Sequence, residues 1–264
     1  MSVAVSLVPH PPTRTNAPNM LAIASGKGGV GKTWLAISLS HALARMGRRA
    51  LLFDGDLGLA NVDIQLGLMP RHDLGGVLAG RLSLAQTAED YAAGGFAIIA
   101  GRSGCGRLAG LPPARLDALG DELVAEARLY DHVILDLGAG LDPTVRRLAR
   151  LAGRCIVVIS DEPTSLTDGY AFVKVMQLER AAVDIQVVVN MANSVRDGEK
   201  TFAALFRACA SFLKISPQLL GVVRRDPKVR EAIRAQTSLF TRFPNCAAAA
   251  DVERIAARIL RMSR

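Results

Sequence analysis

The sequence predicts an α/β protein with one folded domain, built on a doubly wound and mostly parallel sheet. Short apolar runs alternate with longer helical stretches from Met20 onward, and no linker-like stretch interrupts them. Runs that are apolar throughout are typical of strands covered by helices on both faces of a sheet. We therefore expect residues 20–264 to form one domain. Residues 1–19 hold four prolines and no helical period, so we expect a flexible tail there.

Each element follows from its local pattern. Apolar runs rich in β-branched residues predict strands, and amphipathic stretches predict helices. The expected strands are 20–24 (MLAIA), 49–54 (RALLFD), 95–100 (GFAIIA), 130–136 (YDHVILD), 154–160 (RCIVVIS), 184–190 (DIQVVVN) and 218–223 (QLLGVV). The expected helices are 33–46, 113–128, 143–151, 166–181 and 198–213. Ligands of such sheets bind beyond the carboxyl ends of the strands, so functional residues should follow the strand runs.

Composition narrows the class of protein. The net charge of +8 suits an anionic partner, although the arginines are scattered and a solvated basic surface is the alternative. The four cysteines have no CxxC spacing, which argues against a zinc or haem site and for a reducing compartment. No apolar stretch reaches the length of a membrane span, and no signal-peptide pattern opens the chain. We expect a cytoplasmic protein.

A phosphate-binding loop follows the first expected strand. The stretch from Gly26 to Thr33 fits G-x-x-x-x-G-K-[ST] and opens a helix, which is the context that this motif requires. Glycines let backbone N–H groups turn towards phosphate oxygens, Lys32 would bridge the terminal phosphates, and Thr33 would ligate Mg²⁺. The expected nucleotide-binding residues of the loop are Gly26, Lys27, Gly28, Gly29, Val30, Gly31, Lys32 and Thr33.

A second lysine, Lys27, follows the first glycine of the loop. Its side chain starts at the outer rim of the loop, so it reaches across the site more readily than into it; an ordinary exposed lysine is the alternative. The pattern KGGxGK[ST] resembles the MinD/ParA family of dimerising ATPases, in which this lysine contacts phosphates in the partner's site. The resemblance implies an ATP-dependent homodimer in which Lys27 acts in catalysis together with Lys32.

Three carboxylates follow two of the expected strands. Asp54 and Asp56 lie just after the second run, where residues i and i+2 point the same way, although turn formation is the alternative. Asp136 ends HVILD, a Walker B pattern that would hold Mg²⁺, unless it is a strand-end carboxylate without metal. The resemblance implies that Asp56 positions or deprotonates the attacking water and that Asp54 supports the Mg²⁺ shell. The expected metal residues are Thr33, Asp54 and Asp136.

Two further segments belong to the expected nucleotide site. Asn190 ends the run IQVVVN, and its amide offers the donor and acceptor that the edge of adenine needs; a turn-forming asparagine is the alternative. The resemblance places the segment DPKVRE, which begins with Asp226 and Pro227, near the base and ribose.

Longer stretches separate the subfamilies. The segments DGDLGLANVDIQLGL, DLGAGL, DEPTSLTDGYAFVKV, VVNMANS and DPKVREAI together resemble regulators of flagellar number, the FlhG/FleN type. The resemblance implies an ATP-driven monomer–dimer switch for flagellar number or placement, with ATP or ADP and Mg²⁺ as cofactors. The partners that it implies are a flagellar GTPase of the signal-recognition-particle (SRP) type, a flagellar transcription activator and basal-body switch proteins. It also allows recruitment from the cytoplasm to the membrane or flagellated pole.

The chain departs from its relatives in several places. Gly55, Leu137 and Trp34 stand where relatives usually carry alanine, threonine and a small polar residue, and the bulky Trp34 would alter loop packing or turnover. The tail lacks the DQA motif through which many relatives stimulate the GTPase. Residues 251–264 form either a last helix packed on the sheet, which we favour, or a basic amphipathic helix on a membrane.

Two other functions stay open. A partition or division-site ATPase of the same fold would use DNA or membrane as its track, although we do not expect DNA here. An ATP-binding protein with negligible hydrolysis would act by sequestering a flagellar transcription activator. An iron–sulfur carrier is disfavoured, because DLGAGLDPT contains no cysteine.

Overall fold

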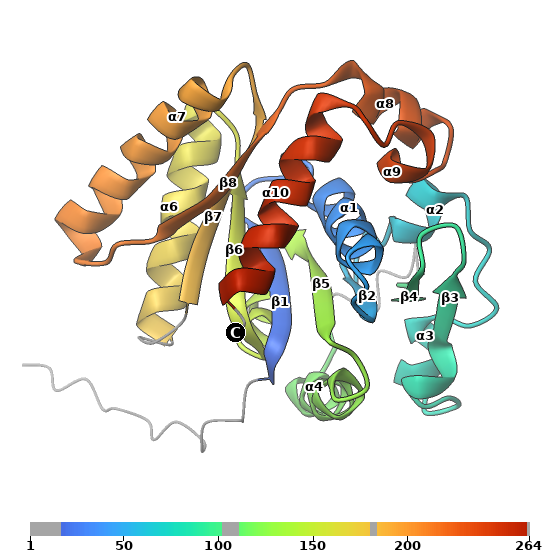
Figure 1. Cartoon of the computed structure of the whole chain (residues 1–264). Coiled ribbons are helices and arrows are strands. Elements are labelled where there is room, and N and C mark those ends of the chain that lie inside the picture. Colours follow the sequence, from blue (N-terminus) through green and yellow to red (C-terminus); the bar gives the residue numbers. More distant parts are fainter. Residues whose placement is uncertain (1–16, 102–110, 180–183, 263–264) are drawn as a thin grey trace, which may run out of the picture.

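The structure of the protein, a computed structural model, describes residues 17–101, 111–179 and 184–262. These residues form one sheet with the strand order β3-β4-β2-β5-β1-β6-β7-β8 (Figure 1). The strands are β1 (Ala17–Ser25), β2 (Ala50–Gly55), β3 (Ala88–Tyr91), β4 (Phe96–Ile99), β5 (His132–Ala139), β6 (Ala152–Ile159), β7 (Asp184–Ala192) and β8 (Gln218–Arg224). Neighbouring strands pair in parallel except β3, which is antiparallel to β4. The expected mostly parallel sheet is confirmed.

Helices cover both faces of this sheet (Figure 1). They are α1 (Lys32–Arg45), α2 (Val62–Leu66), α3 (Leu74–Leu78), α4 (Pro113–Ala127), α5 (Pro143–Ala149), α6 (Pro163–Glu179), α7 (Val195–Ala208), α8 (Pro227–Arg234), α9 (Leu239–Arg242) and α10 (Ala247–Met262), with a 3-10 turn η1 (Ala85–Thr87) and a π-helical turn η2 (Cys209–Leu213). One core contains side chains of α4 to α7, and the other contains side chains of α1, α8, α9 and α10. Along β6, Val157 lies in the first core and Val158 in the second, because successive strand side chains point to opposite faces. The doubly wound arrangement is therefore confirmed.

The N-terminal boundary of the fold differs from the expected one. Strand β1 begins at Ala17, so residues 17–19 belong to the sheet and not to a tail. The side-chain amide of Asn19 donates hydrogen bonds to the carbonyls of Ala127 and Tyr130, which ties the start of β1 to the end of α4. The prolines of this stretch hid the strand, since proline is tolerated at a strand's first residues. The rest of the expected tail, residues 1–16, lies outside the described residues.

The C-terminal helix packs on the sheet. Val252, Ile255 and Ile259 of α10 are buried, at 0 %, 1 % and 0 % exposure, in the core that α10 shares with α1. The apolar stripe of α10, which could also have suited a membrane, is therefore buried in the protein core. For the described residues up to Met262, the expected packing of this last helix on the sheet is confirmed. No described helix combines the length and hydropathy needed to cross a membrane.

Candidate functional site

The glycine-rich loop 26–31 connects β1 to α1. Gly31 has φ of 89°, and a Cβ there would lie 2.4 Å from the side-chain nitrogen of Asn190. A Cβ on Gly26 would lie 2.1 Å from the carbonyl oxygen of Asp168 in α6. Both positions therefore require glycine, because the loop is held tightly between α6 and the end of β7. The loop leads into the N-terminus of α1, whose unsatisfied N–H groups favour an anion such as phosphate.

Lys32 is the first residue of α1, and its side chain is buried. Burial lowers the pKa of the Lys32 amine, while the carboxylates of Asp136 and Asp56 oppose this shift. Neither a hydrogen bond nor an ion pair is formed by this amine within the described ranges of the chain. A buried cation is expensive unless it is paired, so the position calls for an anionic ligand.

Asp136 lies in β5 next to the loop and is buried. Burial and then the neighbouring Asp54 carboxylate raise the pKa of Asp136 well above its ordinary value, while a hydrogen bond from the Thr33 hydroxyl and the charge of Lys32 lower it. Its Oδ1 atom has no hydrogen-bond partner among the residues that the structure describes. A carboxylate oxygen that accepts no hydrogen bond and a neighbouring threonine hydroxyl are oxygen ligands of the kind that Mg²⁺ prefers. These residues therefore fit the metal.

Asp54 lies beside Asp136 across β2 and β5 but has a different environment. Its Oδ2 accepts N–H donors from Asn61 and Val62 at 3.0 and 3.1 Å, and its Oδ1 accepts the N–H of Asp56 at 3.3 Å. Burial raises the pKa of Asp54 to about 7, and these N–H groups oppose the shift. Both oxygens are thus used to hold the segment that leads into α2. The geometry favours support of the site over direct ligation of a metal.

Asp56 lies nearer the surface, at the mouth of the same site. Its Oδ1 accepts the N–H groups of Gly58 and Leu59 at 3.3 and 3.0 Å. A Cβ added to Gly138 would lie 3.4 Å from this oxygen, so the segment after β2 lies against the end of β5 here. Asp56 is therefore held in place by backbone donors while its carboxylate stays close enough to Lys32 to affect the lysine pKa.

Lys27 lies apart from the buried residues. Its Nζ donates a hydrogen bond to the Thr164 hydroxyl at 2.7 Å and forms an ion pair with Glu162, both at the start of α6. The hydrogen bond from Lys27 and its charge lower the pKa of Glu162. Within one chain, the Lys27 side chain is therefore held at the start of α6. The sequence pattern does not single out Glu162 or Thr164 as site residues, although both lie in the stretch EPTSLTD.

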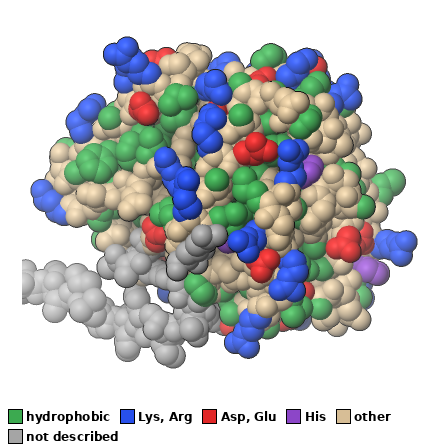
Figure 2. All heavy atoms as spheres, in the orientation of Figure 1, with side chains coloured by type: hydrophobic (Ala, Val, Ile, Leu, Met, Phe, Trp, Pro, Cys, Tyr) green, Lys and Arg blue, Asp and Glu red, His purple; other side chains and the backbone are tan. Residues whose placement is uncertain are grey.

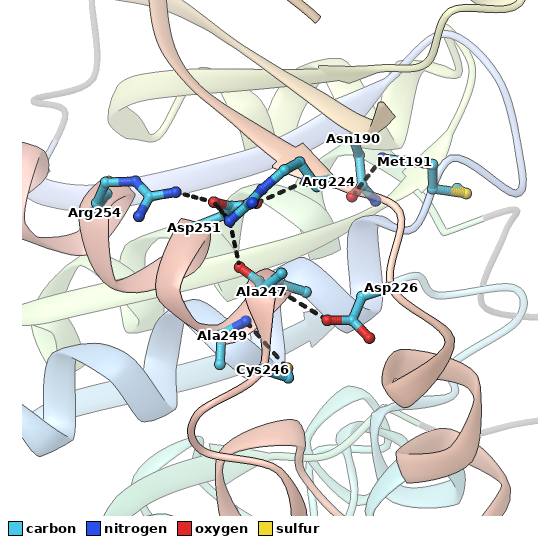
Figure 3. Close-up of polar contacts among 10 residues, drawn as sticks. Asn190, Met191, Arg224, Asp226, Cys246, Ala247, Ala249, Asp251 and Arg254 are labelled. Atoms are coloured by element: carbon cyan, nitrogen blue, oxygen red, sulfur yellow. Dashed lines mark hydrogen bonds and ion pairs between the residues drawn. The ribbon is translucent and has the colours of Figure 1, made fainter. Parts of the chain in front are cut away.

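Asn190 and Met191 end β7 beside the loop (Figure 3). The Asn190 amide nitrogen donates to the Val30 carbonyl at 2.8 Å, and its oxygen accepts the Met191 N–H at 2.9 Å. Met191 has a φ of 58°, which is uncommon for a residue with a side chain. Asn190 thus fixes the loop and a tight turn, which agrees with the turn-forming alternative. Its amide keeps one further N–H and one lone pair for a ligand.

Asp226 and Pro227 begin α8, and Asp226 acts as the helix N-cap. One Asp226 oxygen accepts the Lys228 N–H at 2.9 Å, and the other accepts the Ala248 N–H at 3.2 Å. Burial opposes ionisation of Asp226, but these N–H donors outweigh it and lower its pKa. Asp226 therefore joins the starts of α8 and α10. Pro227 fits position N1, where no N–H is needed.

Two of the departures from the relatives compensate one another. Gly55 and Leu137 are partners in the β2–β5 register. A Cβ on Gly55 would lie 3.0 Å from the Leu137 Cδ2, so the smaller residue makes room for the larger one. Trp34 lies in the core of α1 at 6 % exposure, and its Nε1 lacks a partner among the described residues.

The parts described above define the class of protein. A glycine loop at a helix N-terminus, with a buried lysine and a carboxylate pair at the carboxyl ends of parallel strands, makes this a P-loop nucleotide-binding protein. The sequence also matches the family model of the CobQ/CobB/MinD/ParA nucleotide binding domain over residues 21–239. The chain belongs to this family. The expectations of a MinD/ParA-type P-loop ATPase and of a nucleotide cofactor are confirmed.

Known proteins are similar over nearly the whole chain. The antiactivator FleN of Pseudomonas aeruginosa is 35 % identical over 91 % of this chain and 85 % of its own length. The flagellum site-determining protein YlxH of Helicobacter pylori is 27 % identical over 89 % of this chain and 80 % of its own. The cell division ATPase MinD of Pyrococcus furiosus has a TM-score of 0.79 at 25 % identity and covers 93 % of this chain and 100 % of its own. MinD of Pyrococcus horikoshii, solved with Mg-ADP, has a TM-score of 0.79 at 26 % identity and covers 94 % and 98 %.

Proposed function

We propose that this protein is an Mg²⁺-dependent ATPase that regulates flagellar number or placement through an ATP-driven monomer–dimer switch. One observation carries the ATPase part: the buried Lys32 ammonium and the Asp136 Oδ1 both lack a hydrogen-bond or ion-pair partner among the described residues, and the two charges are close enough to shift each other's pKa. Mg²⁺ and nucleotide phosphates supply the missing opposite charges. The flagellar part rests on the similarity to FleN and YlxH.

The loop binds the phosphates in this proposal. The backbone N–H groups of residues 26–31 surround the phosphate oxygens, and Lys32 pairs with the terminal phosphates. Thr33 and Asp136 hold Mg²⁺, and Asp54 supports that shell through the backbone that it fixes. The metal supplies charge neutralisation on the phosphates. In this proposal Asn190, Asp226 and Pro227 would contact the base and ribose.

Asp56 is the residue that we assign to the attacking water. Its Oδ1 is held by two backbone N–H groups, so the carboxylate has a fixed direction at the mouth of the site. A fixed carboxylate orients water or takes up its proton. Because phosphoryl transfer relies on positioning and charge stabilisation, such a fixed group contributes to the rate without binding the nucleotide.

Lys27 is the residue that couples nucleotide to dimerisation. In one chain its ammonium rests on Glu162 and Thr164 at the surface and so does not serve its own phosphate site. In a symmetric dimer the lysine of each subunit reaches the phosphates of the other. A partner then binds the dimer. The candidate partners are an SRP-type GTPase of the flagellum, a flagellar transcription activator or basal-body switch proteins. The protein acts from the cytoplasm and is recruited to the membrane or flagellated pole through such partners.

A second function is favoured by one relative. The 35 % identical FleN is an antiactivator by its name. An ATP-bound form with slow hydrolysis would restrain a flagellar transcription activator by binding it. In this case the dimer itself would be the active species, and hydrolysis would only end the interaction.

Enzyme assays and a genetic test examine the proposal separately. Wild type should release phosphate from ATP only with Mg²⁺, and Asp136→Asn should abolish this release. Deletion of the gene should change the number or position of flagella, and only wild type should restore them. Normal flagella after deletion would refute the flagellar role and leave the ATPase intact. Hydrolysis that does not depend on Asp136 or Mg²⁺ would refute the site.

A further inference from the structure

A groove lies at the edge of the sheet, away from the nucleotide site. Strand β8 is the last strand of the sheet on this side within the described part of the chain, and it runs between α7 and α10 (Figure 1). The groove has a volume of about 420 Å³. Its floor is apolar, formed by Leu219, Val222 and Ile255, and Val195 of α7 forms part of its wall.

Three arginines of α10 line one side of this groove. They are Arg254, Arg258 and Arg261, spaced by about one helical turn, so they follow one another along the same face. Figure 2 shows basic side chains on this side of the molecule with hydrophobic side chains between them. The acidic lining residues are Glu199 and Asp251. The arginines therefore outnumber the carboxylates in the groove.

The acidic residue Asp251 does not balance this charge. It is buried and forms ion pairs with both Arg224 and Arg254, so a single negative charge is shared by two positively charged guanidinium groups (Figure 3). Arg224 also donates its backbone N–H to the same carboxylate. Arg261 has no hydrogen bond or ion pair within the described ranges and is exposed. The groove thus keeps a surplus of arginine donors facing solvent.

The edge of β8 is closed to another strand. Register with β7 shifts between Leu219 and Gly221, which is a bulge. Arg258 uses one nitrogen to donate to the carbonyls of Leu219 and Leu220, at 2.9 and 2.8 Å. Successive carbonyls of a regular strand point in opposite directions, so the bulge is what brings both within reach. A bulge and a charged residue at an edge are devices that block strand pairing. Recognition here must therefore come from side chains.

We propose that this groove, between α7, β8 and α10, binds an acidic segment of a partner protein. Carboxylates of the segment pair with Arg254 and Arg261, which have guanidinium groups at the rim, and apolar side chains of the segment fill the floor over Leu219 and Ile255. Charge complementarity selects this occupant: an arginine fork matches a carboxylate with two parallel hydrogen bonds. The proposal does not depend on the proposed function, because none of these residues belongs to the nucleotide site.

A labelled peptide of alternating aspartate and leucine tests the proposal on the full chain. Its binding is measured by fluorescence anisotropy, with the lysine–leucine peptide as the control ligand. Reversal of two charges, in the double variant Arg254→Glu and Arg261→Glu, should weaken binding of the acidic peptide by about tenfold or more. Arg128→Glu, an exposed change just after α4 on the other face of the sheet, should leave it unchanged. Equal loss in both variants would show attraction to overall charge only and would overturn the proposal.

Photo-crosslinking identifies the occupant. A benzophenone side chain replaces Val195, which is 41 % exposed at the wall of the groove. A crosslink to the acidic peptide that the arginine double variant loses would support the proposal. A crosslink to residues 1–16 of the same chain, or to a second copy of the chain, would overturn it, because the groove would then serve the protein's own assembly. Circular dichroism of each variant shows that the fold is retained.

Discussion

Replacement of Lys27 by alanine tests whether this residue acts between subunits. The structure shows that the Lys27 Nζ forms its hydrogen bond and ion pair with Thr164 and Glu162, the polar partners that it has among the described residues, and the ion pair is exposed. Exposed ion pairs contribute little to folding. We therefore expect Lys27→Ala to keep the fold and to bind ADP about as well as wild type, because ADP requires no contact across a dimer.

Dimerisation with ATP should respond very differently. A charge-assisted contact to phosphate in a desolvated interface contributes about 2–3 kcal/mol. A two-fold symmetric dimer uses the contact twice, so Lys27→Ala removes about 4–6 kcal/mol from dimer formation. This corresponds to a rise of about 10³- to 10⁴-fold in the dimer dissociation constant. Hydrolysis should fall with the population of dimer.

Sedimentation velocity with a slowly hydrolysed ATP analogue measures the dimer directly. Glu162→Gln is the matched variant, since it removes the charge that attracts Lys27 in one chain and leaves the lysine held only by its hydrogen bond to Thr164. This variant should dimerise at least as well as wild type. A Lys27→Ala protein that forms the ATP dimer at wild-type concentrations would refute the reasoning.

Mixing two inactive variants decides whether Lys27 acts in trans. Lys27→Ala keeps Asp56, and Asp56→Ala keeps Lys27, so one site of a mixed dimer holds an intact Asp56 and receives an intact Lys27. Activity should return on mixing to part of the wild-type rate. If mixed dimers form and no activity returns, Lys27 is a ligand of its own site or a surface charge.

Four further outcomes follow from the same geometry. Lys32→Ala should weaken ATP-analogue binding by about 30- to 150-fold, from the loss of about 2–3 kcal/mol, and an unchanged titration would discard the phosphate site. Asp56→Ala should bind ATP and dimerise but hydrolyse about 10²-fold more slowly in a phosphate-release assay, and failure to bind would make Asp56 structural. Gly31→Ala should lower the free energy of unfolding by about 1–3 kcal/mol in urea titrations. Gly28→Ala is the control, because the nearest atom to its added Cβ is 4.0 Å away. Equal effects of the two substitutions would contradict the close contact between Gly31 and Asn190. Burial and then the charge of Arg45 lower the pKa of His41 to about 4 in the folded protein. Between pH of about 6.5 and 4, His41 is therefore protonated in the unfolded chain but neutral in the folded one, which favours unfolding as the pH falls. Stability should drop by about 3 kcal/mol across that window and should drop less in His41→Gln; equal slopes would show that other groups control the pH dependence.

The strands, the helices around them and the phosphate loop could be predicted from the sequence, because their signals are local. Mostly apolar runs such as HVILD indicate strands that are buried on both faces of a sheet. The glycines of the loop indicate backbone conformations that other residues rarely adopt. The strand β3 escaped prediction because AEDY carries no apolar run, and it forms only by pairing with β4. The helices α2, α3 and α9, with 5, 5 and 4 residues, are too short to show a helical period.

The use of each polar group was decided by the tertiary structure. Asp54 and Asp136 both follow apolar runs, but the backbone N–H groups of Asn61 and Val62 reach Asp54. Among the residues that the structure describes, an oxygen without a donor therefore remains on Asp136 and not on Asp54. Lys27 meets Glu162 across a separation of 135 residues. Likewise, the apolar stripe on residues 251–264 shows that this face must be shielded from water, by protein or by a membrane. The tertiary structure decides between the two, because α1 and α10 share one core in the described residues. A sequence determines which groups need a partner; which partner they obtain depends on distant segments that the fold brings together.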